Sequence, residues 1–448
     1  MRKILLGTTA VVGAALIAPA AFAQAPAAAT TPVASAPALA GAGGLSVRLG
    51  GFFDFQFGMI QDDWDRARSR NTVAPIANNR GGRQRTDMRN DLELHVFVDG
   101  RAANGMTYGA VIEFQMDNNA IGSGHLVDMD EAYVFLSFPN FGTLRFGQED
   151  NAASLLQVRG PTSTALGGDG DWWRFVNNAG LPGTSSMYLT SGINDGNDAT
   201  KVIYLSPQFA GFDFALSYGA NQGEGRRTDA QRDRTTLENE WSAAVRYRGT
   251  FGPVGVALGL GAMGANSPKQ TAEGAILASS VRGQQVVAYT AGATIRWAGF
   301  AFGGEFTWGS YNGTVGRNAL APGLDDSYHY LLGGTYTMGP LVFGAVFGQA
   351  FQDNGTRVTR NAAGAITALR DVEDRRHTIW GIGAAYTLAP GLVLYGYYNN
   401  INDKNVPGVV PSDGRYVAGA ATGTTLASFN GGNTRTINVL AMGIRMAF

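Results

Sequence analysis

Residues 435–448 read Arg435-Thr-Ile-Asn-Val-Leu-Ala-Met-Gly-Ile-Arg-Met-Ala-Phe448. The second half of this stretch alternates between two kinds of side chain. One parity holds large apolar residues, and the other holds Arg445 and small residues; the apolar set is Leu440, Met442, Ile444, Met446 and Phe448. Because side chains on a strand alternate between its faces, one face suits lipid and the other suits a watery lumen. The stretch therefore predicts the closing strand of a membrane-spanning β-barrel.

The opposite end of the chain has the pattern of a secretory signal peptide. Arg2 and Lys3 precede an apolar stretch over residues 4–18, which is followed by Pro19 and the small-residue site Ala21-Phe22-Ala23. The alternative, a membrane anchor, is disfavoured because the stretch is short for a spanning helix. We expect cleavage after Ala23, with residues 1–23 as the signal peptide, 24–44 as a flexible Ala/Pro-rich leader and 45–448 as the barrel domain.

Composition excludes several classes of protein. The whole chain has a formal net charge of −1, and removing residues 1–23 takes away two basic residues and no acidic one. A weakly acidic chain argues against a nucleic-acid partner. Cysteine is absent, which excludes disulfides, thiolate metal sites and a cysteine nucleophile. Beyond the signal segment there is no apolar run of about 20 residues, so a membrane role requires strands.

Strand-like runs fill the rest of the chain. In residues 87–99, Leu92, Leu94, Val96 and Val98 share one face, while charged residues and His95 share the other. A soluble sandwich would also alternate, but its connections would be similar at both ends. Here short turns alternate with long polar segments, as an outer-membrane barrel requires. About sixteen strands are predicted: 45–60, 87–101, 105–117, 128–138, 143–148, 200–209, 212–220, 238–249, 254–264, 284–297, 300–310, 327–338, 341–352, 376–388, 391–401 and 435–448.

Two hairpins resemble those of proteobacterial general porins. Glu131-Ala-Tyr-Val-Phe-Leu-Ser137 with Phe141-Gly-Thr-Leu-Arg-Phe-Gly147 is similar to the family's "AYVGL…FGTLxxG" hairpin. Tyr204-Leu-Ser-Pro207 with Phe209-Ala-Gly-Phe212 is similar to its "Y-x-SP-x-F-x-GF" hairpin. The match is strongest over residues 128–220. It departs from the family at Phe135, where Gly is usual, and in lacking a "PEFGG"-like segment, so the detailed constriction of enterobacterial porins does not carry over.

The resemblance implies an all-β, antiparallel barrel that assembles as a homotrimer in the bacterial outer membrane. Each barrel would hold a water-filled pore for passive diffusion of small hydrophilic solutes, narrowed by an inward-folded third extracellular loop in the position of residues 149–199. Phe448 resembles the terminal signature that the outer-membrane assembly machinery recognises. The other partners expected are the lipid bilayer and outer-leaflet lipopolysaccharide, with no cofactor.

Charged residues of lumen parity supply the candidate pore wall. A charge at the midplane of the lipid face would cost about 2–4 kcal/mol, so parity assigns these residues to the lumen. The expected wall set is Arg48, Arg89, Arg145, Asp54, Glu93 and Glu113, and Arg246, Arg248, Arg296 and Glu305 share that parity. The expected constriction-loop set is Glu149, Asp150, Arg159, Asp169, Asp171 and Arg174.

Opposed acidic and basic groups across an aqueous gap create a transverse field that favours small polar solutes. On this hypothesis Arg48, Arg89 and Arg145 face the acidic residues of the loop, and replacing Asp169 and Asp171 with Asn shifts ion selectivity toward anions. The plainer interpretation is that the charged residues are solvated wall positions. Trp172 and Trp173 either anchor the loop or line a path for sugars.

Other functions stay open at this point. A barrel enzyme would need a nucleophile and base near His95, His125, His329 or His377, and no such constellation is recognisable. A channel selective for sugars or anions is a nearer alternative. Ca²⁺ could bind Asp169-Gly-Asp171 or Asn194-Asp-Gly-Asn-Asp198, although neither has the downstream Glu of an EF-hand. A soluble periplasmic β-protein is the remaining alternative.

Overall fold

The computed structural model describes residues 39–40, 44–63, 85–117, 127–169, 172–176, 188–223, 236–267, 284–313, 319–320, 323–360, 366–371, 373–406 and 434–448. The predicted signal peptide and the side chains of Asp171 and Arg174 lie outside the described residues, as does His125. In the described part of the chain, no helix has the length and apolar character needed to cross a bilayer.

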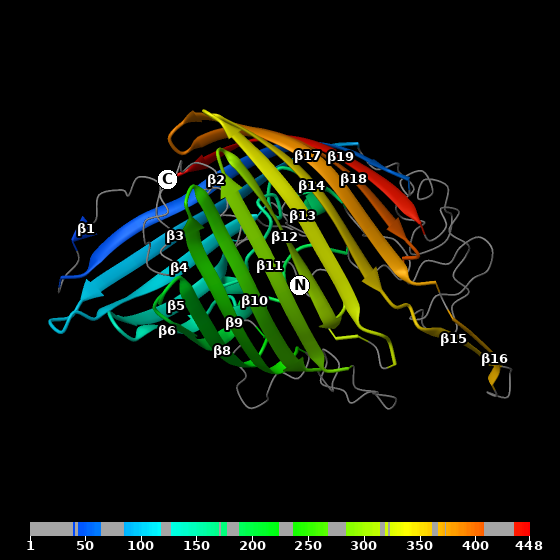
Figure 1. Ribbon diagram of the computed structural model, residues 1–448, viewed down its shortest axis with the longest axis horizontal. Helices are drawn as coiled ribbons and strands as arrows, with labels where there is room; N and C mark the ends of the chain where they lie inside the picture. The colour runs from blue at the N-terminus through cyan, green and yellow to red at the C-terminus, as the bar shows by residue number, and fades with distance from the viewer. Residues whose placement is uncertain are drawn as a thin grey trace.

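Sixteen antiparallel strands close into one barrel, which confirms the predicted fold (Figure 1). The strands are β2 (Ser46–Asp62), β3 (Thr86–Arg101), β4 (Thr107–Asp117), β5 (Asp128–Phe138), β6 (Gly142–Gln148), β7 (Thr200–Leu205), β8 (Phe212–Asn221), β9 (Glu238–Phe251), β10 (Val254–Asn266), β11 (Val286–Trp297), β12 (Phe300–Ser310), β13 (Ser327–Met338), β14 (Leu341–Gln352), β17 (Arg375–Ala389), β18 (Leu392–Lys404) and β19 (Arg435–Ala447).

The barrel closes where its last strand meets its first. β19 pairs antiparallel with β2 in the register Arg445↔Asp54. The chain end continues this ladder, because the amide of Phe448 donates to the carbonyl of Gly51 and the amide of Gly51 donates to the carbonyl of Phe448. Closure leaves no open edge among the sixteen barrel strands, which is the condition for strands to span a bilayer.

The outer face carries the lipid-facing apolar residues that alternation predicts. On β19 the exposed side chains are Leu440, Met442, Ile444 and Met446, and Phe448 follows them. β12 exposes only aromatic side chains among its large residues, namely Phe300, Phe302, Phe306 and Trp308. A continuous surface of large exposed apolar side chains would be unfavourable in water. On the outer face of a membrane barrel, the same side chains contact lipid.

Tight turns join the strands at one end of the barrel. Ala298 and Gly299 between β11 and β12 have φ values of 48° and 85°. Ala210 and Gly211 before β8 have φ values of 48° and 90°. Two successive positive φ angles fit the right-handed twist of the flanking strands, which is why such pairs close hairpins.

Three details differ from the expected strand pattern. β7 ends at Leu205 instead of residue 209, because Pro207 has no N–H to continue the ladder. β5 has a register shift opposite Ile112 and Phe114, so both Asp130 and Glu131 lie across from Glu113. Residues Thr356–Arg360 (β15) and Ile366–Asp371 (β16) pair as a separate hairpin inside an expected loop, and Leu39–Ala40 (β1) pairs with β2 inside the expected leader.

Candidate functional site: the inner loop and the pore wall

The described residues between β6 and β7, which are 149–169, 172–176 and 188–199, lie inside the barrel, as expected for an inward-folded third loop (Figure 1). It contains α3 (Ala152–Leu155), whose N-terminus is capped by the side chain of Asn151, and the 3-10 helix η2 (Trp172–Phe175). α3 packs against β7, β8, β9 and β10, and η2 reaches β19. The loop therefore passes along much of the inner wall.

Apolar clusters fill the space between this inner loop and the wall. Trp172, Phe175 and Leu189 of the loop pack with residues of β2, β17, β18 and β19, and Trp173 lies against the same cluster. Ala153 and Ile193 pack with residues of β10 and β11. The side chain of Trp172 is fully buried and stacks on His377. Its contacts are those of an anchor.

Five lumen-facing glycines of the wall, the glycine track, lie directly against the first arm of the loop, residues 149–169. Gly292 on β11 lies under Val158, and a Cβ there would overlap the Val158 carbonyl oxygen. Gly383 on β17 lies under Leu166, whose Cα would be 2.7 Å from an added Cβ. The other members of this glycine track are Gly259, Gly333 and Gly344. Without side chains at these positions, the loop backbone can rest on the sheet itself.

Asp169 joins the first arm of the loop, residues 149–169, to the second arm, residues 188–199. Its carboxylate accepts hydrogen bonds from the Ser191 amide at 2.8 Å and the Trp172 indole at 3.1 Å, and also from the amide and hydroxyl of Thr190. The side chain is fully buried. The structure thus corrects the expectation that Asp169 faces the pore, because its carboxylate satisfies the loop's own donors.

Histidine and asparagine side chains attach the loop to the wall. His329 on β13 contacts the Gly192 carbonyl oxygen through Nε2 at 2.7 Å and the Tyr311 hydroxyl through Nδ1 at 2.7 Å. Asn399 on β18 donates from its amide to the Gly167 carbonyl oxygen. Glu305 on β12 accepts from the Gln157 side chain at 2.8 Å and the Gly192 amide at 3.1 Å. Glu305 thus shares the lumen parity expected of it, and it holds the loop.

At the base of the loop, Arg145 and Glu149 form the contact that the sequence predicted between wall and loop. Arg145 pairs with Glu149, and its guanidinium lies 4.8 Å from the centre of the Tyr133 ring. Nearby, the buried ammonium of Lys201 donates to three loop carbonyls, those of Glu149, Gly196 and Ala199. The start and the end of the loop are therefore fixed to β6 and β7.

The other expected wall charges also point inward, mostly as local pairs. Arg48 binds Asp99 at 2.8 Å, Arg89 lies 3.8 Å from Asp91 and 5.9 Å from the centre of the Phe175 ring, and Arg159 of the loop lies 3.9 Å from Glu305. Asp54 accepts from the Tyr395 hydroxyl at 2.6 Å.

Of the three wall arginines expected to face loop acids, Arg145 meets one and Arg48 instead meets a wall acid. Arg246 and Arg248 share the single carboxylate of Asp213, at 2.6 Å and 3.0 Å. Arg296 is exposed beside the turn after β11.

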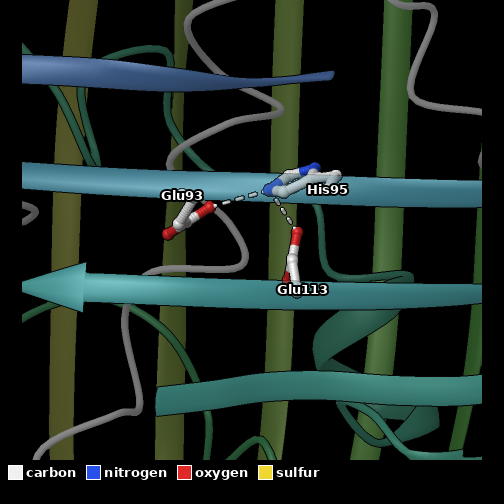
Figure 2. Close-up of side chains that lie close together, drawn as sticks. All are labelled: Glu93, His95 and Glu113. Carbon is white, nitrogen blue, oxygen red and sulfur yellow. Dashed lines mark hydrogen bonds and ion pairs between the residues drawn. The ribbon is translucent and has the colours of Figure 1, made fainter. Parts of the chain in front are cut away.

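Glu93, His95 and Glu113 form a compact cluster on β3 and β4 (Figure 2). His95 Nε2 lies 3.1 Å from Glu93 Oε2 and 2.6 Å from Glu113 Oε1. The sequence placed the two glutamates on the wall but did not predict that they share one imidazole. The signal was present, because residues 93 and 95 share a face and residue 113 is the cross-strand partner of His95.

A second acidic cluster lies where the loop meets β5. One carboxylate oxygen from each of Glu131, Asp150 and Asp198 lies within 4.8 Å of the others. Burial raises the pKa of the loop carboxyls of Asp150 and Asp198 well above the usual range, and the carboxylates of Asp195 and Asp130 raise them further. Keeping these loop groups ionised at neutral pH therefore opposes folding.

This cluster predicts a stabilising substitution. Asp198 has a φ of 46°, which Asn adopts readily. We expect Asp198→Asn to raise the melting temperature of the barrel at neutral pH, because it removes a buried charge. The folded state binds the proton more tightly than the unfolded state, so wild-type stability should rise as pH falls toward the unperturbed carboxyl pKa of 3.8. The advantage of the variant should therefore vanish below about pH 4.

Thermal unfolding in detergent, followed by circular dichroism across this pH range, measures the effect. Asp213→Asn is the matched control and should have the opposite sign, because Arg246 and Arg248 lose their shared acceptor. A loss of stability in Asp198→Asn at neutral pH would contradict the prediction.

The chain matches the family of Gram-negative porins over residues 8–406. It is similar to the solved anion-selective porin from Comamonas acidovorans, with a TM-score of 0.53 and 17% identity over 90% of this chain and 100% of that one. A triple mutant of the Rhodopseudomonas blastica porin aligns over the same shares, with a TM-score of 0.48 and 15% identity. No curated protein matches the chain. Since the family match spans most of the chain, the protein belongs to the Gram-negative porin family.

Proposed function

We propose that this porin is a general diffusion channel whose selectivity filter is the inner loop together with the charged wall of β2 to β9. As a Gram-negative porin, the chain is an outer-membrane channel for diffusion, and family and fold point to a channel rather than an enzyme. The observation that carries the proposal is the division of the barrel into an apolar outer face and an inner face of paired charges with a loop fixed across it.

Paired charges suit a channel that does not bind its solutes. An arginine that already shares a carboxylate holds a solute anion weakly, so ions and small polar molecules pass without being trapped. The pairs Arg48–Asp99, Arg145–Glu149 and Arg246–Asp213 lie on three different parts of the wall. This arrangement supports passive diffusion of small hydrophilic solutes.

We infer a homotrimer in contact with outer-leaflet lipopolysaccharide, delivered by a signal peptide cleaved after Ala23. Phe448 would serve as the signal for the barrel assembly machinery, and its position in the closing ladder supports that role. No cofactor is invoked, and Ca²⁺ binding by the acidic segment Asn194-Asp-Gly-Asn-Asp198 stays a prediction.

Reconstitution into planar bilayers tests the channel. We expect stable conductance in steps of three, with a reversal potential close to zero in a salt gradient. Bilayers that stay electrically silent with correctly folded protein would contradict the proposal. Single conductance steps instead of triplets would contradict only the inferred homotrimer.

An anion-selective channel is the second candidate, because two arginines of β9, Arg246 and Arg248, share the one carboxylate of Asp213 and leave a local positive excess beside it. The structurally similar Comamonas acidovorans protein is named as anion-selective. A reversal potential displaced toward that of chloride, and returned toward zero by Arg248→Gln, would favour this candidate over general diffusion.

A further inference from the structure

The cluster of Glu93, His95 and Glu113 has the composition of a metal site. Glu93 and His95 lie two residues apart on the inner face of β3, and Glu113 lies opposite His95 on β4. Figure 2 shows both carboxylates directed at the same imidazole nitrogen. Rigid neighbouring strands, and not loops, hold all three groups.

The two carboxylates of this cluster have few ion-pair and hydrogen-bond partners. In the described part of the chain, Glu93 and Glu113 form ion pairs only with His95. Gln115 adds one long hydrogen bond of 3.5 Å to Glu93 Oε1. Glu113 is 6% exposed, yet its Oε2 atom has no hydrogen-bond partner among the described residues. A buried carboxylate oxygen without a donor is an unmet polar group, which a bound cation or an ordered water would satisfy.

We propose that Glu93, His95 and Glu113 bind a divalent transition-metal ion of the Zn²⁺ type in the pore wall. An imidazole nitrogen with two carboxylate oxygens is a donor set that Zn²⁺ accepts, whereas Ca²⁺ and Mg²⁺ require about six oxygen ligands. Bonds of about 2.0–2.1 Å in a tetrahedral site place ligand atoms about 3.3 Å apart. His95 Nε2 is already 3.1 Å and 2.6 Å from the two oxygens, so small side-chain movements would admit the ion.

The ion would take the place of a proton between the imidazole and the carboxylates. His95 Nε2 and one oxygen each from Glu93 and Glu113 provide three ligands, and a water molecule from the lumen would provide the fourth. The side chains of His95 and Glu113 keep 9% and 8% of their surface exposed, which gives a small ion access. Because ligands must be deprotonated, binding releases the proton of a charged imidazole.

Metal titration of the folded barrel in detergent tests the site without using channel activity. Isothermal titration calorimetry with ZnCl₂ should show one ion per chain, and X-ray absorption should show nitrogen and oxygen ligands without sulfur. We expect His95→Gln and Glu113→Gln to weaken binding at least about tenfold, since each removes a ligand. Far-UV circular dichroism confirms that each variant is folded.

Two control variants separate this site from other acidic groups. Asp99→Asn removes one wall carboxylate elsewhere and should leave the affinity unchanged. Asp198→Asn removes a member of the second acidic cluster and should also leave it unchanged. Absence of binding by the wild type would overturn the proposal, as would loss of binding in Asp198→Asn with full binding in His95→Gln.

The electrical consequence rests on the proposed channel function. The ion brings two positive charges and displaces one proton, so the wall gains one positive charge, and Zn²⁺ should shift the reversal potential toward anion selectivity in the wild type and not in His95→Gln. A silent channel that still binds Zn²⁺ in detergent would count against the channel and leave the metal site standing. A conducting channel that binds no Zn²⁺ would do the reverse.

Discussion

Asp169→Ala is expected to increase the fluctuations of the open-channel current. The substitution removes the acceptor of the Thr190 and Ser191 amides and of the Trp172 indole, all of which are buried. A buried donor left without a partner costs about 1–3 kcal/mol, so the join between the two arms of the loop is lost. Single-channel recordings should show larger open-state current fluctuations and added substates, while far-UV circular dichroism shows an intact barrel.

Asp99→Asn is the matched control for this experiment. It also removes one inward carboxylate, but Asp99 pairs with Arg48 on the wall and does not contact the loop donors. The control should keep quiet currents. A quiet Asp169→Ala channel with a displaced reversal potential would instead restore Asp169 as a group that faces the pore.

The double substitution Gly292→Ala and Gly383→Ala is expected to narrow the pore. Each added methyl group would meet loop backbone, at Val158 and at Leu166. Overpacking of this kind costs about 1–3 kcal/mol per site, and the barrel wall is held by its ladders, so the loop must move toward the axis. Single-channel conductance should fall, and the melting temperature should decrease.

Gly396→Ala provides the control on the lipid face. Its nearest neighbour to an added Cβ is the Ala441 carbonyl oxygen at 3.4 Å, and no loop residue lies there. Conductance should stay at the wild-type value. If the double variant is folded and conducts like Gly396→Ala, the glycine track does not set the position of the loop.

The strands could be predicted because their pattern depends on local sequence. Lipid on one side and water on the other force a period of two, and the residues of β19 follow it without exception from Leu440 onward. Glu93 and Glu113 were placed correctly on the inner face by the same rule. The bulge that turns both Asp130 and Glu131 inward was not predicted, since an extra residue in one strand leaves no mark in the alternation until the partner strand is known.

The path of the loop could not be predicted, because its contacts join residues far apart in the chain. Asn399 and Gly167 are 232 positions apart, and no local pattern connects them. Lumen-facing glycines such as Gly292 and Gly383 are visible in the sequence, but only the folded loop shows what they receive. For Asp169, an acidic residue in a polar segment fits a pore-facing role and a backbone-binding role equally well. Burial decides between them, and burial is a tertiary property.

The pairing of β19 with β2 makes the cylinder depend on the final segment of the polypeptide. A chain shortened before Arg435 would have two unpaired strand edges, one on β18 and one on β2. The backbone amides and carbonyls of these edges would have no hydrogen-bond partner in hydrocarbon. Inserting an incomplete barrel would therefore cost free energy for every unpaired backbone group along both strand edges. This cost favours insertion of the complete barrel in one step. Before β19 pairs, the free edges of β18 and β2 would be open to edge-to-edge pairing with other chains.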